Sequence, residues 1–292
     1  MTILKTDTVS GIGTEGTVFE GDITFDSLNY MTLPKGTTTQ SNRGRGLFAG
    51  GGPSYSKQIN YIQIQSQGNT TKFGDLLTAL ADMQGGSSST RGLFGAGLGS
   101  GSPGFVNTIE YVTIATTSNA TNFGDLNEIN FQGSALANDT RYVYGGGTTP
   151  TVKDVMDYVT IASAGNATDF GDVTSEDTRN AMGVSSSTRG VIAGGQTNAP
   201  SNGTDAIDFL TIATTGNTTD FGNLTDGRRR GSGLSNSIRG VFTGGYDPAV
   251  KNTIDYITIA PTGNAQDFGD YSGASIGRLG TSASDSHGGL SE

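Results

Sequence analysis

Residues 239–270 read RGVFTGGYDPAVKNTIDYITIAPTGNAQDFGD, and this stretch decides the fold. An Arg-Gly pair opens it, two glycines stop a short apolar run, and a segment rich in Ile, Thr and Tyr then alternates with a period of two. β-Branched and aromatic residues in that period are typical of a half-buried strand. A Gly-Asn turn leads to a Phe-Gly pair, so the stretch predicts three consecutive β-strands.

The same phrase occurs five times along the chain, so the protein is built from repeats of about fifty residues. The step from the mid-repeat aromatic to the closing Phe is 12 residues in every copy, whereas the step from the opening Arg to that aromatic varies from 16 to 20. We therefore expect a rigid second half and a variable loop after the Gly pair. The markers are the opening arginines (Arg45, Arg91, Arg141, Arg189, Arg239), the mid-repeat aromatics (Tyr61, Tyr111, Tyr158, Phe209, Tyr256) and the closing phenylalanines (Phe73, Phe123, Phe170, Phe221, Phe268).

A small, polar segment precedes each opening Arg, as in RNAMGVSSSTRG at 179–190, and it suits an inner strand crowded around an axis. Four strands per repeat predict an all-β protein, a five-bladed β-propeller with repeats starting near residues 45, 91, 141, 189 and 239. The 47 glycines agree with many strands joined by turns, and the absence of cysteine excludes a disulfide scaffold and cysteine-bound zinc.

The di-Gly, the variable loop and the strand with a central Tyr resemble the kelch repeat over residues 37–292. This resemblance implies a kelch-like propeller and says nothing about chemistry. The chain departs from the family pattern in one respect: kelch repeats often carry a Trp near the last strand, where this chain has Phe123, Phe170 and their equivalents.

The end of the chain predicts how the ring closes. The tail GASIGRLGTSASDSHGG aligns with residues 226–240 and stops before a new second strand can form. We expect residues 273–290 to supply the inner strand of the first blade, which would leave no open sheet edge. Residues 37–44 are the rival for that place.

Residues 1–36 do not carry the repeat and predict an extended N-terminal β-arm. Such an arm cannot bury much apolar surface alone, so we expect it to dock elsewhere. The start of the chain and its repeats resemble structural proteins of tailed bacteriophages, particularly marine and cyanobacterial phages. The arm's candidate anchoring residues are Phe19, Phe25, Leu28, Tyr30 and Leu33.

That resemblance implies a virion protein, either a tail fibre or spike or a capsid decoration. Its arm would bind other virion proteins, its propeller would face a host-surface glycan or protein, and it would be an oligomer in the assembly. Two other functions stay open, a cellular kelch-like interaction module and, well behind, a glycan-active enzyme.

No catalytic residue, metal site or cofactor is predicted. His287 is the only histidine, and neither a catalytic triad nor a histidine metal site can be assembled around it. The net charge of −10 disfavours nucleic acid, and we interpret the only basic run, Arg228 to Arg230, as a solvated strand edge. The sequence contains no apolar stretch long enough to insert in a membrane and no signal-peptide centre at its start.

An acid stands before four of the mid-repeat aromatics: Glu110, Asp157, Asp208 and Asp255. Oxygen ligands from several blades could form a cation ring at the axis. We favour a structural interpretation, in which these acids contact arginines within their own blade and Asp residues cap turns, because a motif that serves folding must also recur. The Asn-x-Thr triplets at Asn69, Asn119, Asn166 and Asn217 are explained by turn geometry rather than by glycosylation.

The variable loops are the best candidates for recognition, because loop diversity on a rigid scaffold is the usual arrangement for binding. Their exposed aromatics could stack on sugars or protein patches. The alternative is that these loops only tolerate sequence drift. The candidate binding residues are Tyr55, Phe105, Lys153, Asn198, Tyr246 and Lys251.

Overall fold

The computed structural model describes residues 44–51, 55–64, 68–100, 104–174, 179–197 and 202–271. These residues form nineteen β-strands, all antiparallel, and no helix. The chain divides into two units, residues 1–41 and 42–292, and every described residue belongs to the second. The predicted arm with its five anchoring residues, the closing strand 273–290 and Asn198 lie outside the described residues, so these predictions are untested.

The strands fall into five consecutive sets, and each opening arginine is the first residue of a strand, as predicted. The second strands are β1 (Arg45–Ala49), β5 (Arg91–Gly99), β9 (Arg141–Gly145), β13 (Arg189–Ala193) and β17 (Arg239–Thr243). The third strands are β2 (Ser56–Gln63), β6 (Phe105–Thr113), β10 (Val155–Thr160), β14 (Ala206–Thr211) and β18 (Thr253–Thr258). The outer strands are β3 (Thr71–Ala81), β7 (Thr121–Asp125), β11 (Thr168–Asp172), β15 (Thr219–Asn223) and β19 (Gln266–Asp270).

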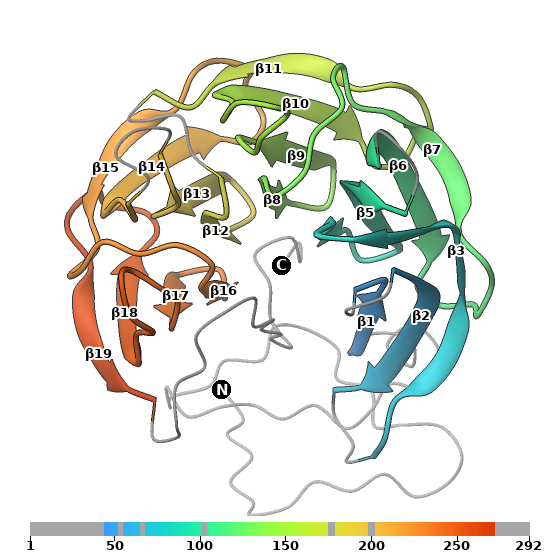
Figure 1. Ribbon diagram of the computed structural model, residues 1–292, viewed down its shortest axis with the longest axis horizontal. Helices are drawn as coiled ribbons and strands as arrows, with labels where there is room; N and C mark the ends of the chain where they lie inside the picture. The colour runs from blue at the N-terminus through green and yellow to red at the C-terminus, as the bar shows by residue number, and fades with distance from the viewer. Residues whose placement is uncertain are drawn as a thin grey trace, which may run out of the picture. The chain divides into compact units, whose positions relative to one another are not determined.

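Four short inner strands precede the second strands of sets two to five, namely β4 (Gln84–Ser87), β8 (Ser134–Ala137), β12 (Met182–Ser185) and β16 (Ser232–Ser235). Sets three, four and five are separate four-stranded sheets. Sets one and two share a seven-stranded sheet, because the long β3 pairs with β5 at Leu80 and Ala81. Figure 1 shows the sets following one another around a common axis, with the inner strands nearest to it.

A stack of three side chains recurs in every set and explains the constant step of 12. In set three, Arg141 lies 4.4 Å above the ring of Tyr158, and Tyr158 meets Phe170 edge-on with ring centroids 5.8 Å apart. Tyr158 pairs with Thr168 across the two strands, so its ring reaches Phe170 two residues further along the outer strand. A change in the step would break this contact.

The opening arginines of sets one to four also join their set to the next one. Arg91 donates to the carbonyl of Ile161 at 2.7 Å and Arg141 to that of Ile212 at 2.9 Å, both about 70 residues further along the chain. The expected contact between this arginine and the acid of its own blade is therefore wrong. The guanidinium instead binds an aromatic face within its set and a backbone carbonyl in the next set.

The Gly-Asn turns fasten the outer edges of neighbouring sets. In the turn that precedes β15, Gly216 donates its N–H to the carbonyl of Phe170, and the amide oxygen of Asn217 accepts from the N–H of Asp172. Asn119, Asn166 and Asn264 make the same contact with the preceding outer strand. These turn contacts give the Asn-x-Thr triplets at Asn119, Asn166 and Asn217 a structural role.

Gly171 leaves room for this turn, which leads to a first prediction. A Cβ at Gly171 would stand 2.5 Å from the carbonyl of Gly216, and the φ of +136° disfavours any side chain. Gly171→Ala is expected to lower the free energy of unfolding by about 2–3 kcal/mol in denaturant titrations. Gly165→Ala is the matched control, because a Cβ there meets no atom within 4 Å, and it should cost less than about 0.5 kcal/mol. Equal costs would contradict this account of the turn.

Candidate functional site

The two ends of the strand sets differ, and one of them carries all the variable segments. The residues just before the inner strands pair with residues just after the Gly pairs, in the bridges Phe131–Thr148, Arg179–Gln196 and Arg229–Tyr246. The segments that lead to the inner strands and the variable loops therefore share one side, which we call the loop face. The Gly-Asn turns and the short turns before the opening arginines form the opposite side, which we call the turn face.

Four side chains of the loop face surround the axis, and we call them the axial ring. Each lies nine residues before an opening arginine, and each has a left-handed backbone although none is glycine: Asp82 (φ 53°), Gln132 (φ 60°), Asn180 (φ 56°) and Arg230 (φ 62°). Left-handed backbone outside glycine is uncommon and strained. Sequence reasoning missed this ring, although four different polar residues at one fixed place of a regular repeat were the signal.

Hydrogen bonds link the axial ring from set to set. The amide of Gln132 donates to Asp82 at 3.3 Å, and the amide of Asn180 donates to Gln132 at 3.3 Å. The backbone N–H of Asn180 donates to the carbonyl of Gln132, and that of Arg230 to the carbonyl of Asn180. The ring thus presents a carboxylate, two amides and a guanidinium in order around the axis.

The described strands also surround a cavity of about 730 Å³, and none of the four ring residues lines it. The inner strands β4, β8, β12 and β16 line it together with β1, and so do Met83, Ala181 and Gly231, each directly after a ring residue. Small residues such as Gly85, Ala135 and Ser185 keep this space open near the axis.

The predicted binding residues of the loops differ in how freely they project. Tyr55 is 38% exposed, as expected. Phe105 and Tyr246 are only half-exposed, because Phe105 stacks on Phe131 at 4.6 Å and Tyr246 lies beneath the guanidinium of Arg229 at 5.5 Å. Lys153 pairs with Glu128 at 3.0 Å and Lys251 with Asp226 at 2.5 Å.

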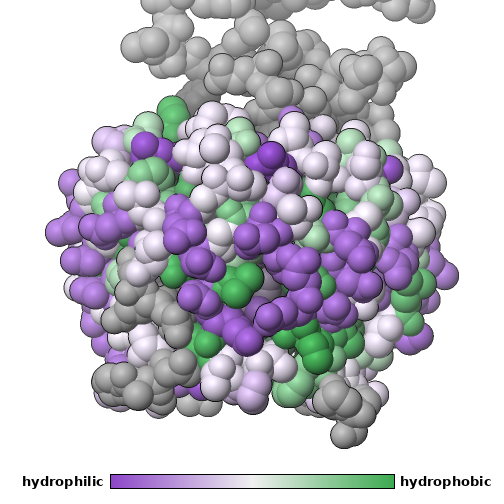
Figure 2. Space-filling view, turned by 90° about the horizontal axis from the view of Figure 1, so that it is seen from above, coloured by the Kyte–Doolittle hydropathy of each residue, from purple (hydrophilic) through white to green (hydrophobic). Residues whose placement is uncertain are grey.

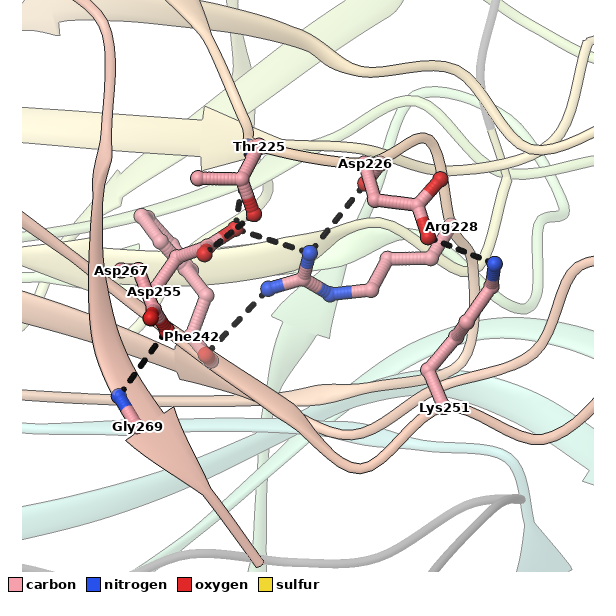
Figure 3. Close-up of polar contacts among 8 residues, drawn as sticks. All are labelled: Thr225, Asp226, Arg228, Phe242, Lys251, Asp255, Asp267 and Gly269. Carbon is pink, nitrogen blue, oxygen red and sulfur yellow. Dashed lines mark hydrogen bonds and ion pairs between the residues drawn. The ribbon is translucent and has the colours of Figure 1, made fainter.

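The basic run Arg228–Arg230 is not a solvated strand edge. Arg228 is completely buried and forms an ion pair of 2.8 Å with the equally buried Asp255 (Figure 3). The guanidinium also donates to the carbonyls of Asp226 and Phe242. The prediction failed because the partner acid stands 27 residues downstream, where no local pattern connects it to the run.

The repeated acids cap the preceding set rather than ring a cation. Glu110 accepts from the backbone N–H of Leu77 at 2.8 Å, Asp157 from that of Asn127 at 3.0 Å, and Asp255 from that of Thr225 at 3.2 Å. Asp208 is buried at the same repeat position. Among the described residues, no group of three or more His, Asp or Glu side chains could hold a metal ion.

Burial makes two of these acids sensitive to pH. Desolvation raises the pKa of Glu110 and of Asp157, although backbone hydrogen bonds oppose it. Because the pKa of each carboxyl is higher in the folded than in the unfolded state, each group stabilises the fold fully at pH values below its unfolded pKa. This stabilisation is lost as the pH rises through the folded-state pKa. Glu110→Gln with Asp157→Asn is therefore expected to flatten the decline in unfolding free energy as pH rises from about 4 to 7. Identical pH profiles for variant and wild type would contradict this.

Figure 2 shows one outer side of the described strands, where apolar groups are scattered among polar ones and do not merge into a broad patch. The described residues contain no helix that is both long and apolar enough to cross a membrane.

Comparisons with known proteins support the fold and no more. No protein-family model and no curated protein matches the sequence. The fold resembles that of a solved structure described as "Structure of YjhT", which has a β-propeller-type fold, with a TM-score of 0.59, 12% sequence identity and coverage of 74% of this chain and 79% of that chain. In all, 362 solved chains match, so the fold is common and does not select a function. The chain has an all-β, propeller-type fold.

Proposed function

We propose that this chain is a non-enzymatic binding protein that displays a propeller and meets its partner with the loop face. One observation carries the proposal: the loops of variable length and the strained axial ring lie on the same face, whereas the turn face repeats nearly unchanged turns. Variable loops on a constant scaffold, around a polar site at its axis, are an arrangement suited to recognition.

The proposal includes the architecture in its finer form, a five-bladed kelch-like propeller. In sets two to five an inner strand pairs with the second strand, whereas β1 has no such partner among the described residues. β1 also lines the cavity. We expect residues 273–290 to pair with β1 and close the ring, with residues 37–44 as the rival segment.

The setting that we propose is the virion of a tailed phage, as tail fibre, spike or capsid decoration. The N-terminal arm would bind other virion proteins and the loop face a host-surface glycan or protein. Immunogold labelling of purified particles tests the setting, and labelled particles are the expected result. A chain found only free of particles, and captured with a cellular protein, would favour the alternative of a cellular interaction module.

A pair of substitutions tests the binding role. Tyr55→Ala with Tyr246→Ala removes two aromatic rings of the loop face and leaves Phe105 on Phe131, whose loss would disturb packing. Adsorption of the fluorescently labelled protein to host cells is expected to fall at least tenfold. The control is Thr117→Ala, an exposed position of the turn face, which should adsorb like wild type. Unchanged adsorption of the double variant would overturn the proposed role of the loop face.

A further inference from the structure

We infer that the axial ring is a binding site for a single saccharide unit, held by Asp82, Gln132, Asn180 and Arg230. This inference rests on the proposed function and gives its partner a chemical class. The first argument concerns the backbone. A left-handed residue with a side chain costs free energy that glycine avoids.

The repeat mostly uses glycine where the chain needs this conformation, although Ala96 adopts it with φ 57° in set two. At the first glycine of the Gly pairs, Gly50, Gly146, Gly194 and Gly244 have φ between 63° and 66°. At the axial-ring position none of the four copies has glycine, although φ is nearly the same, 53° to 62°. Asn and Asp tolerate this conformation better than Gln and Arg. A side chain is therefore retained against the conformational preference in every described copy.

The second argument concerns which amino acid stands at the ring position in each copy of the repeat. Several positions that serve folding repeat their residue, as the opening arginine and the closing phenylalanine do in all five copies, although the position of the buried Arg228 carries Leu80 in another copy. The axial ring carries a different residue in each of its four copies. The hydrogen bonds between these side chains are long, 3.3 Å in both cases, so a better-placed ligand group can replace them. The short bonds between neighbouring sets at this position come from the backbone N–H groups of Asn180 and Arg230, which require no particular side chain.

The chemistry of the ring fits hydroxyl groups. The carboxylate of Asp82 accepts hydrogen bonds, the guanidinium of Arg230 donates them, and the two amides do both. Each hydroxyl of a sugar also donates and accepts, and neighbouring hydroxyls present both properties side by side. An ion is a poorer match, because the ring carries both signs of charge.

The surroundings add space and an aromatic face. Met83, Ala181 and Gly231, each directly after a ring residue, are among the residues that line the cavity. Tyr246 pairs with Arg229, the residue directly before Arg230, and its aromatic ring lies 5.5 Å from the guanidinium of Arg229. Aromatic faces next to planar polar side chains suit the apolar C–H face of a sugar.

Glycine substitutions separate a binding role from a structural one. Asn180→Gly and Gln132→Gly relieve the backbone and remove the amides, so the melting temperature is expected to stay the same or rise by about 1–3 °C. Binding to an array of bacterial surface oligosaccharides, and calorimetric affinity for the strongest ligand on it, are expected to fall at least tenfold. Asn180→Asp, which keeps a side chain suited to the conformation, provides a second folded variant that should also bind more weakly. Thr117→Ala on the turn face is the control.

Each outcome of these experiments either supports or overturns the saccharide site. Weaker binding by thermally stable glycine variants supports the site. Glycine variants that bind as tightly as wild type, or that melt more than about 5 °C lower, show that the side chains serve folding and overturn the inference. A wild-type protein that adsorbs to cells but binds no saccharide on the array overturns the ligand class and leaves the proposed binding face intact. A wild-type protein that adsorbs to no cell contradicts the proposed function itself.

Discussion

Asp255→Asn is expected to lower the free energy of unfolding by about 3–5 kcal/mol. The substitution leaves the guanidinium of Arg228 completely buried with no opposing charge. The carbonyls of Asp226 and Phe242 would still accept from it, but dipoles do not replace a carboxylate at 2.8 Å. Unfolding in guanidinium chloride, followed by far-ultraviolet circular dichroism, measures this loss. Circular dichroism is used because the chain has no Trp whose fluorescence could report unfolding.

Arg228→Leu provides the matched comparison. Leu80 occupies the equivalent position, eleven residues before an opening arginine, and is buried there. After Arg228→Leu, Asp255 keeps its bonds from the backbone and hydroxyl of Thr225, much as Asp157 is held by Asn127 without an arginine. This variant should therefore lose about 1–3 kcal/mol, less than Asp255→Asn. A larger loss for Arg228→Leu would contradict this account of the pair.

Phe268→Ala is expected to cost nearly as much as Phe170→Ala, about 3–5 kcal/mol, if the ring closes as proposed. Phe170 is 2% exposed beneath the Gly-Asn turn of the next set, whereas Phe268, at the same repeat position, is 55% exposed among the described residues. The first repeat has the matching turn at 68–70, where its residues are exposed. If the ring closes, the turn at 68–70 would cover the side chain of Phe268, and both would become buried.

The comparison of these two variants in one denaturant series tests closure directly. The control is Phe48→Ala on β1, which is 38% exposed and should cost less than about 1.5 kcal/mol. A cost for Phe268→Ala below about 1 kcal/mol, with Phe170→Ala at full cost, would mean that β19 remains an open edge and that the chain does not form a closed propeller.

The sequence was most informative where neighbouring strands are close along the chain. The alternation in residues 253–258 and the constant step of 12 predicted the third and outer strands, because both features arise from pairing within one set. The opening arginines marked strand starts because the apolar run that follows each of them must be buried.

Contacts between sets could not be predicted, since they join residues far apart in sequence. Arg141 reaches the carbonyl of Ile212, and Glu110 caps Leu77, so neither contact follows from the pattern of one repeat. The burial of Arg228 depends in the same way on Asp255. The loop residues were predicted from variation, but packing on Phe131 and pairing with Glu128 reduce the exposure of Phe105 and Lys153.

The axial ring was missed for a different reason. A left-handed backbone at Gln132 or Arg230 leaves no local signature, because these residue types seldom adopt it. Comparison of the position nine residues before each of the last four opening arginines would have found it, since polar residues there differ while their surroundings repeat.

The central claim is that the loop face meets the partner, and one measurement tests it most directly. The chain has no cysteine, so a single one can be placed on either face and joined to a bulky polyethylene glycol. Ala249→Cys lies on the loop face and Thr117→Cys on the turn face, and both positions are exposed. We expect the polymer at position 249 to abolish adsorption to host cells and the polymer at 117 to leave it unchanged. Loss of adsorption from position 117, with position 249 unaffected, would place the partner on the turn face and contradict the account.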